Sequence, residues 1–282
     1  MTLKLVLQGP QADQAQLARI AALAQPAATR ALHTHALRCD GFEFSPELKA
    51  RIESAAYAAG VDATFIDAAR TLSDFKLVAM DMDSTLITIE CIDEIADMQG
   101  LKPEVSAITE AAMRGELDFA ESLTRRVALL KGLPAQALQR VYDERLGISP
   151  GGEAMLAAVR AAGLRTLLVS GGFTFFTERL KDRLGLDFTH ANLLEEEGGR
   201  LTGRVVGGIV DAEEKMRTVQ RVCTQFGIEP RQAIVMGDGA NDLRMMGIAG
   251  LSVAFRAKPV VRAQADVALN FTGLDGLLAV LA

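Results

Sequence analysis

The sequence is poor in cysteine, lacks a long apolar run and has no excess of positive charge. Its 282 residues include three cysteines, and no two of them form a Cys-x-x-Cys pair, so neither a disulfide framework nor a zinc cluster is indicated. No apolar stretch approaches the roughly 20 residues needed to cross a bilayer, and the first ten residues become polar too soon for a signal peptide. The formal net charge of −6 argues against general binding to nucleic acid, which requires a basic surface. We therefore expect a cytoplasmic protein that binds neither membranes nor nucleic acid.

The chain is longer than an average domain, and 49% of its residues are apolar, so it can form one large core with a smaller unit attached. Residues 1–70 are predicted to be that smaller α+β unit. The order of its strands and helices resembles that of the small ferredoxin-like (ACT) modules that sense amino acids, and it carries no cluster of catalytic type. Its predicted elements are strands at 3–7 and 63–66, helices at 12–23 and 46–59, and an extended stretch between 26 and 37.

A short apolar run from Leu77 to Met80 ends abruptly in two acids, Asp81 and Asp83. The run does not alternate with polar residues, which predicts a strand that is covered on both faces. In an open parallel sheet, ligands bind at the carboxyl ends of the strands. Two carboxylates this close repel each other unless a cation or a shared proton lies between them, so the motif indicates either Mg²⁺ or a raised pKa on one acid. An acidic turn that starts a helix is the alternative.

The pattern between residues 88 and 149 is helical, and it interrupts an α/β pattern that resumes afterwards. Because this block directly follows the first core strand, it would overhang the carboxyl edge of the sheet as a cap. The predicted fold class is α/β, with a parallel sheet in residues 71–282, a helical cap at 88–149 and the small N-terminal unit. Further strands are predicted at 166–169, 233–236, 251–254 and 267–269, with a hairpin between 191 and 206.

Three of the apolar strands end in polar residues of a catalytic type, and a predicted helix adds a lysine. Parallel strands place their carboxyl ends on one edge, so these groups can converge in one pocket. Carboxylates, a hydroxyl, exposed backbone N–H groups and an ammonium suit phosphate better than other ligands. Taken singly, each could be a turn, a helix start or a surface lysine. The residues are Asp81 and Asp83 after the first strand, Ser170 and Gly171 after the second, Asp238, Asn241 and Asp242 after the third, and Lys215 on the helix 212–226.

The chemistry of phosphoryl transfer suggests a role for each group. Asp81 is the expected nucleophile, because a carboxylate can attack phosphorus to form an aspartyl-phosphate. Asp83 is the expected general acid and base. Mg²⁺ held by Asp81 and Asp238, with Asp83 as a third candidate ligand, would neutralise the approach of phosphate to an anionic nucleophile. The phosphoryl oxygens would be bound by the Ser170 hydroxyl, the Gly171 N–H and Lys215, with Asn241 and Asp242 in support.

Four ordered motifs resemble those of the haloacid dehalogenase-like phosphatases, and the match covers about residues 75–270. They are Asp81-Met-Asp-Ser-Thr, Ser170-Gly-Gly, Lys215 and Gly237-Asp-Gly-Ala-Asn-Asp242. Within that superfamily the chain resembles the phosphoserine phosphatase family, through Glu90-Cys-Ile-Asp-Glu94, Phe119-x-x-Ser-Leu-x-x-Arg-Val127 and Val253-Ala-Phe-x-Ala-Lys-Pro259. The resemblance implies a Rossmann-like core with a cap after its first strand. It also implies Mg²⁺-dependent hydrolysis of O-phospho-L-serine to L-serine and phosphate, the last step of serine biosynthesis.

Such a zwitterionic substrate requires an anion for its ammonium and a cation for its carboxylate, and the cap offers Glu90 and Arg126. In the family, the corresponding positions do this work. Met113 and Phe119 would form an apolar wall that leaves too little space for large substrates. Arg125 lies about 100° around the helix from Arg126 and is expected at the surface. For Glu90, the alternative is an acid favoured by the helix dipole.

Other functions are compatible with parts of this pattern. A sister enzyme for another small phosphomonoester, such as homoserine phosphate, would differ only in the cap. A receiver-type signalling domain also joins paired acids and a lysine, but it is about half this size and has no reason for a helical insertion. An amino-acid sensor or dimerisation module in the first 70 residues is the third alternative. The oligomeric state is open, with a homodimer as one alternative.

Overall fold

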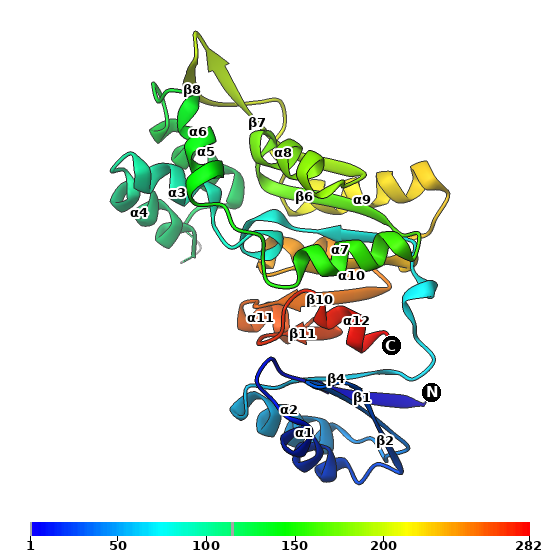
Figure 1. Ribbon diagram of the computed structural model, residues 1–282. Helices are drawn as coiled ribbons and strands as arrows, with labels where there is room; N and C mark the ends of the chain where they lie inside the picture. The colour runs from blue at the N-terminus through cyan, green and yellow to red at the C-terminus, as the bar shows by residue number, and fades with distance from the viewer. Residues whose placement is uncertain (1, 114–115) are drawn as a thin grey trace.

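Within residues 2–113 and 116–282, which the computed structural model describes, the strands form two sheets (Figure 1). The first is antiparallel, with the strand order β2-β3-β1-β4, and two helices pack on it. This is the βαββαβ arrangement of ferredoxin-like units. Its elements are β1 (Leu3–Gln8), α1 (Gln14–Ala21), β2 (Ala28–His33), β3 (Ala36–Asp40), α2 (Pro46–Ala58) and β4 (Asp62–Asp67). The domain limits drawn from the sequence stay a prediction.

The extended stretch predicted between residues 26 and 37 is in fact two strands, because the chain reverses at Thr34 and His35. The His33 ring accepts a hydrogen bond from the backbone N–H of His35 at 3.2 Å, and the His35 ring contacts the Ala12 carbonyl at 2.8 Å. The turn contains neither glycine nor proline, so the usual sequence signal for a hairpin is missing.

The second sheet has the order β11-β10-β9-β5-β6-β7-β8, and its strands are parallel except for the β7–β8 hairpin. The first strand of this sheet, β5, lies in the middle, and the chain continues first to one side of it and later to the other. Ligand sites of open α/β sheets lie at such a switch point. The strands are β5 (Leu77–Met80), β6 (Arg165–Phe173), β7 (Phe188–Glu197), β8 (Arg200–Val206), β9 (Ala233–Gly237), β10 (Leu251–Phe255) and β11 (Val267–Leu269).

Helices cover both faces of this sheet, which explains the unbroken apolar run of β5. Val78 and Met80 join the core on one face, whereas Leu77 and Ala79 join the core on the other. All four residues are fully buried. The covering helices are α7 (Gly152–Ala161), α8 (Thr174–Leu184), α9 (Ala212–Phe226), α10 (Leu243–Ile248), α11 (Pro259–Arg262) and α12 (Gly276–Val280).

A group of helices between β5 and α7 forms the predicted cap, so the predicted fold class is confirmed. The two connections of the cap to the core run side by side, and the Thr88 N–H donates to the Gly147 carbonyl at 2.9 Å. The β7–β8 hairpin reaches up to the cap (Figure 1), where the Gly132 N–H donates to the Leu201 carbonyl at 2.8 Å. The cap helices are α3 (Cys91–Met98), α4 (Lys102–Met113), α5 (Phe119–Leu129) and α6 (Gln136–Glu144).

The N-terminal unit packs on the β11 edge of the core sheet (Figure 1) through buried polar groups. The Asp62 carboxylate, at the start of β4, accepts hydrogen bonds from three successive backbone N–H groups, those of residues 270–272. Nearby, the Gln8 side chain donates to the Gly276 carbonyl at 3.0 Å. Among the described residues, no helix combines the length and the apolar character that crossing a membrane requires. The expected cytoplasmic location stays a prediction.

Candidate active site

Asp81 is the first residue after β5, and its carboxylate is held at the edge of the sheet. The side chain is buried, and its Oδ1 accepts a hydrogen bond from the Met82 N–H at 2.7 Å. Its backbone N–H donates to the Met236 carbonyl of β9, so β5 and β9 stay paired up to this point. The chain then turns sharply, with Ser84 in the left-handed conformation at φ 56°.

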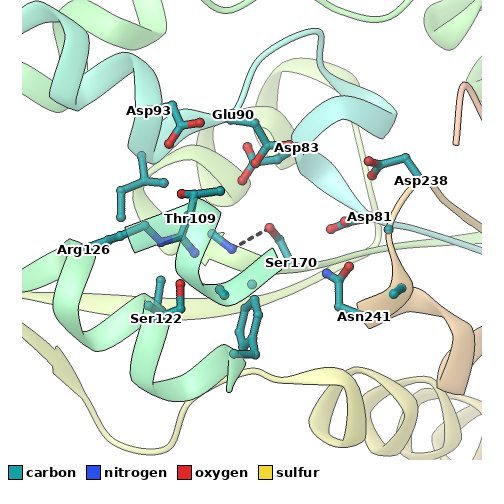
Figure 2. Close-up of a pocket in the computed structure, with 18 of the residues that line it drawn as sticks. Asp81, Asp83, Glu90, Asp93, Thr109, Ser122, Arg126, Ser170, Asp238 and Asn241 are labelled. Carbon is teal, nitrogen blue, oxygen red and sulfur yellow. Dashed lines mark hydrogen bonds between the residues drawn. The ribbon is translucent and has the colours of Figure 1, made fainter. Parts of the chain in front are cut away.

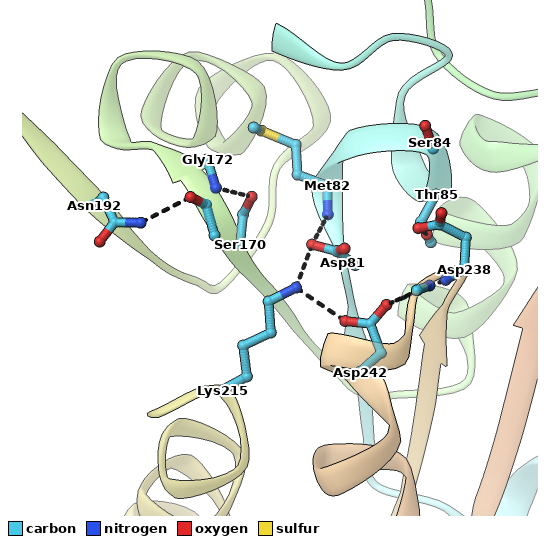
Figure 3. A network of polar contacts seen from close by, with 12 residues as sticks. Asp81, Met82, Ser84, Thr85, Ser170, Gly172, Asn192, Lys215, Asp238 and Asp242 are labelled. Carbon is cyan, nitrogen blue, oxygen red and sulfur yellow. Dashed lines mark hydrogen bonds and ion pairs between the residues drawn. The ribbon is translucent and has the colours of Figure 1, made fainter. Parts of the chain in front are cut away.

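Lys215, in the first turn of α9, lies against Asp81 and is fully buried (Figure 3). Its Nζ is 2.8 Å from Asp81 Oδ1 and 2.9 Å from Asp242 Oδ1. Burial lowers the pKa of Lys215, but the nearby charges of Asp242 and Asp81 more than offset this effect and hold the pKa above its usual range. Lys215 is therefore a permanent cation that fixes one oxygen of Asp81.

Asp242 organises the turn after β9. Its Oδ2 accepts hydrogen bonds from the backbone N–H groups of Asp238 at 3.2 Å and Gly239 at 3.0 Å. A Cβ on Gly237 would lie 2.4 Å from the same oxygen, so this close approach requires glycine. The hydroxyl of Thr85, from the turn after β5, donates to Asp238 Oδ1 at 3.1 Å. The turns after β5 and β9 are thus tied together.

The carboxylates of Asp81, Asp238 and Asp242 each place an oxygen within 4.8 Å of the others. Burial and then Asp242 raise the pKa of Asp81 well above its usual range, although Lys215 opposes this. The same two causes raise the pKa of Asp238 to about 6. A hard divalent cation would relieve this repulsion, and its preferred ligands are carboxylate oxygens. The residues present therefore fit a metal ion. The predicted ligand Asp83 lies outside this group of three, and its role as a ligand stays a prediction.

The segment from Ser170 to Gly172 forms another side of the site. β6 pairs with β7 as far as Val169 and resumes at Phe173, so the regular ladder is broken in between. Within this break the Gly172 N–H donates to Ser170 Oγ at 2.8 Å.

Both glycines of the segment are required by close approaches. A Cβ on Gly171 would lie 2.7 Å from the Phe119 ring of the cap. A Cβ on Gly172 would lie 2.8 Å from Asp83 Oδ2. Side chains at these positions would push both groups out of the site, so the Ser-Gly-Gly motif lets the cap and the acidic turn close on this strand end.

Asp83 lies at the cap side of the site, where the Cys91 N–H donates to its Oδ1 at 3.3 Å. Burial and the nearby charge of Glu90 raise the pKa of Asp83 to about 7. Glu90 itself accepts a hydrogen bond from the Ser84 hydroxyl at 2.7 Å. A carboxyl group that titrates near neutral pH can both release and accept a proton during a reaction.

Arg126 of α5 faces the same space (Figure 2). Its Nε is buried and has no hydrogen-bond partner among the described residues, and neither does Asp93 Oδ1. Burial lowers the pKa of Arg126, whereas Asp93 and Glu90 raise it. A buried donor without a partner is costly unless a ligand completes it, so the Nε atom indicates an anion-binding position. The neighbouring Arg125 pairs instead with Glu121 on the exposed side of the helix.

These groups line one cavity of about 630 Å³. Lys215 and Asp242 do not line it, because they lie buried behind Asp81. Met113 ends α4, but its side chain lies outside the described residues, so its predicted place in the apolar wall stays a prediction. The predicted residues that line the cavity are Asp81, Asp83, Glu90, Phe119, Arg126, Ser170, Gly171, Asp238 and Asn241.

Sequence reasoning missed several residues of the site. Thr85 and Asp93 both lie inside motifs quoted for the family resemblance, so position within the motif was the available signal. Ser122, which lies inside the quoted motif that runs from Phe119 to Val127, and Thr109, which lies outside every quoted motif, also line the cavity. Asn192 of β7 contacts the Ser170–Gly172 segment from outside the cavity, and nothing in its local sequence indicates this (Figure 3).

Comparison with known proteins places this architecture among characterised hydrolases. A model of the haloacid dehalogenase-like hydrolase family matches residues 78–247. The chain is 61% identical over 212 residues to a phosphoserine phosphatase of Polaromonas, covering 73% of this chain and 90% of the relative. It is 49% identical over 221 residues to the phosphoserine phosphatase of Haemophilus influenzae, covering 78% and 70%.

Solved structures agree with the sequence comparison. A probable phosphoserine phosphatase from Vibrio cholerae superimposes with a TM-score of 0.83 at 36% identity, over 99% of this chain and 86% of that one. A substrate-bound phosphoserine phosphatase complex gives a TM-score of 0.69 at 36% identity, over 74% of this chain and 99% of that one.

Proposed function

This chain belongs to the haloacid dehalogenase-like hydrolases and, within them, to the phosphoserine phosphatases, and on that premise we propose that it hydrolyses O-phospho-L-serine to L-serine and inorganic phosphate. The observation that carries this proposal is the make-up of one cavity. Asp81, Asp238 and Ser170 lie at the sheet edge, and Glu90 and Arg126 lie on the cap. The first group suits a phosphoryl group, and the second suits an α-ammonium and an α-carboxylate.

The first chemical step follows from how Asp81 is held. Its Oδ1 is fixed by Lys215 and by the Met82 N–H, so Oδ2 is the oxygen that attacks phosphorus. As the Asp81–phosphorus bond forms, the bond from phosphorus to the seryl oxygen breaks. Asp83, whose pKa is raised to about 7, gives its proton to that leaving oxygen.

The second step releases phosphate. Asp83, now a carboxylate, takes a proton from a water molecule that attacks the phosphorus of the aspartyl-phosphate. The bond to Asp81 breaks, and Asp81 returns to its starting form. Ser170 and the backbone N–H of Gly171 bind the phosphoryl oxygens throughout, where negative charge increases in the transition state. Lys215 keeps Asp81 oriented, and Asn241 lines the cavity.

Mg²⁺ is the proposed metal, held by Asp81 and Asp238. Asp242 accepts hydrogen bonds from Lys215 and from two backbone N–H groups, so its proposed task is to orient Lys215 and the turn after β9. When bound, Mg²⁺ would neutralise the carboxylates and orient the phosphoryl oxygens.

On the cap, Glu90 would bind the substrate ammonium and Arg126 the carboxylate, while Phe119 supplies an apolar wall against Gly171. The Arg126 Nε, which has no hydrogen-bond partner in residues 2–113 and 116–282, supports this assignment. The homodimer considered from the sequence stays a prediction, which sedimentation velocity can check.

A phosphate-release assay across related phosphomonoesters tests the proposal. The panel is O-phospho-L-serine, O-phospho-L-threonine, O-phosphohomoserine, phosphoglycolate and p-nitrophenyl phosphate, each with Mg²⁺ and with a chelator. We expect kcat/KM to be highest for phosphoserine. We expect no phosphate release from any substrate when the chelator removes the metal. Asp81→Asn should abolish release, whereas Asp182→Asn, at an exposed position on α8, should not. Equal kcat/KM across the panel would refute substrate specificity, and full activity of the Asp81 variant would refute the mechanism.

A further inference from the structure

Asn192 of β7 is buried, with 1% of its surface exposed, and both the nitrogen and the oxygen of its side-chain amide form hydrogen bonds. Its Nδ2 donates to the Gly171 carbonyl at 2.8 Å (Figure 3). Its Oδ1 accepts a hydrogen bond from the Val210 N–H at 2.9 Å. An amide is the side-chain group that offers a donor and an acceptor side by side, and only one orientation of this amide satisfies both contacts.

The contact to Gly171 has consequences for the catalytic serine because a peptide unit is planar. The Gly171 carbonyl and the Gly172 N–H belong to one trans peptide, so they point in opposite directions. By holding the carbonyl, Asn192 aims the Gly172 N–H at Ser170 Oγ, to which it donates at 2.8 Å. The serine oxygen is then an acceptor on that side, and its own O–H is left to donate into the cavity.

The hydrogen bond from Asn192 lies at a break in the ladder between β6 and β7. The β6–β7 ladder stops at Val169 and resumes at Phe173, whose partner across the ladder is Asn192 itself. In the gap, ladder hydrogen bonds do not fix the peptides of the Ser170 segment. The glycines there have no Cβ to restrict them, so the orientation of their peptides would otherwise be free.

The carbonyl oxygen of the Asn192 amide bonds next to the start of α9, the helix that carries Lys215. Val210 directly precedes Asp211, which caps α9 by accepting a hydrogen bond from the Glu214 N–H at 2.8 Å. One turn into α9, Lys215 contacts Asp81. Asn192 therefore links the start of α9 to the segment from Ser170 to Gly172. These two elements must keep a fixed separation around one phosphoryl group.

We propose that Asn192 is a positioning residue that orients the Ser170 hydroxyl for the phosphoryl oxygens and fixes the serine segment relative to α9. It touches neither the substrate nor the reacting atoms. The inference rests on the proposed phosphomonoester hydrolysis. It extends that proposal by separating two parts of the cavity, the phosphoryl pocket at the sheet edge and the amino-acid pocket on the cap. We assign Asn192 to the first, because its side chain hydrogen-bonds to Gly171 and Val210, whereas Glu90 and Arg126 lie on the cap and are not among its hydrogen-bond partners in the described part of the chain.

The test is Asn192→Asp, which keeps the shape and the acceptor for Val210 but places an oxygen against the Gly171 carbonyl. Asn192→Ser is the second variant, since it is smaller and removes the repulsion. The readouts are the inhibition constants of inorganic phosphate and of L-serine, together with kcat. We expect the Ki of phosphate to rise by about 10-fold or more and kcat to fall by about 10- to 100-fold. The Ki of L-serine should change by less than about two-fold, because the misaligned Ser170 hydroxyl lies in the phosphoryl pocket, whereas the proposed binding groups for L-serine lie on the cap.

Thr166→Val is the matched control for stability. Thr166 is buried on the same strand β6, and its hydroxyl bonds with Asp187 at the end remote from Ser170. It should lower the melting temperature and leave both inhibition constants unchanged. An unchanged Ki of phosphate in the folded Asn192 variants would overturn the proposal, as would an equal rise in both constants. Measuring phosphate inhibition with p-nitrophenyl phosphate as substrate keeps this test valid if phosphoserine is not the substrate.

Discussion

Lys215 Nζ lies 2.8 Å from Asp81 Oδ1, and both side chains are buried at the end of β5. With Asp238 and Asp242, the group contains three carboxylates and one ammonium, so its formal charge is −3 + 1 = −2 when all are ionised. A divalent cation would balance that charge. The lysine and the proposed metal thus have different tasks: Lys215 holds the nucleophile permanently, and the metal completes the charge balance.

Lys215→Met should remove most activity, because Asp81 loses the cation that orients it. We expect kcat to fall by about 100-fold or more. We also expect a loss of stability of about 3–5 kcal/mol at pH 8, since the partner carboxylates are left buried without their counterion. The control is Lys76→Met, at an exposed position. Phosphate release and thermal unfolding measure the two effects, and an active, stable Lys215 variant would contradict the assigned role.

Much of the core and of the site could be predicted because both depend on local patterns. The apolar run of β5 is unbroken since Val78 and Leu77 pack on opposite faces, and the acid that follows it is forced to the sheet edge. What sequence could not show depends on contacts between distant residues. Asp62 bonds with residue 272, and Asn192 bonds with Gly171, each through a geometry that no local pattern encodes. Lys215 was recognised, but its burial behind Asp81 was not foreseen.

Arg126→Ala should act on substrates that carry a carboxylate. Its Nε is a buried donor without a partner among the described residues, so we expect kcat/KM for phosphoserine to fall by about 100-fold. Turnover of p-nitrophenyl phosphate, which lacks an α-carboxylate, should change by less than about three-fold. Arg125→Ala is the matched control, because this neighbour pairs with Glu121 at the surface. Equal losses for both substrates would indicate a structural role for Arg126.

Removing metal should make stability depend on pH in a defined direction. Burial raises the pKa of Asp83 to about 7 and that of Asp238 to about 6, so the folded state retains protons that the unfolded state has lost. The stability of the metal-free protein should therefore fall as pH rises from about 4, near the usual carboxyl pKa, to about 7, and it should change little above that. Mg²⁺ should stabilise the protein more at pH 8 than at pH 5. At pH 8 and 100 times its Kd, it should add about 3 kcal/mol of stability and raise the melting temperature accordingly.

Asp238→Asn tests this pH dependence, because it removes one carboxyl group whose pKa is raised and, with it, one proposed metal ligand. Its metal-free form should lose less stability between pH 5 and pH 8 than the unmodified protein does, and Mg²⁺ should stabilise it less. Differential scanning calorimetry with and without chelator measures both. The same Mg²⁺ response in the variant would show that the ion binds elsewhere.

Asp62 holds the N-terminal unit to the core by a set of hydrogen bonds that resembles an anion site. Its oxygens accept from the N–H groups of Asn270 at 2.7 Å, Phe271 at 3.2 Å and Thr272 at 3.0 Å, and from the Thr272 hydroxyl at 2.8 Å. The residue is 1% exposed, so these contacts are shielded from water. Charge-assisted bonds of this kind are stronger than neutral ones.

Asp62→Asn should therefore weaken the contact between the two sheets, because one amide N–H group would face backbone N–H donors and the negative charge would be lost. We expect about 2–4 kcal/mol of destabilisation and a melting temperature lower by several degrees. Asp67→Asn, at the other end of β4, is the matched control, since its side chain accepts a hydrogen bond from the nearby Ala69 N–H within the N-terminal unit. Hydrogen exchange should show faster opening at residues 270–272 in the Asp62 variant alone. Because these residues follow β11 at the edge remote from Asp81, kcat should stay unchanged at temperatures where the variant is folded, and a fall in kcat there would mean that the N-terminal unit also supports the active site.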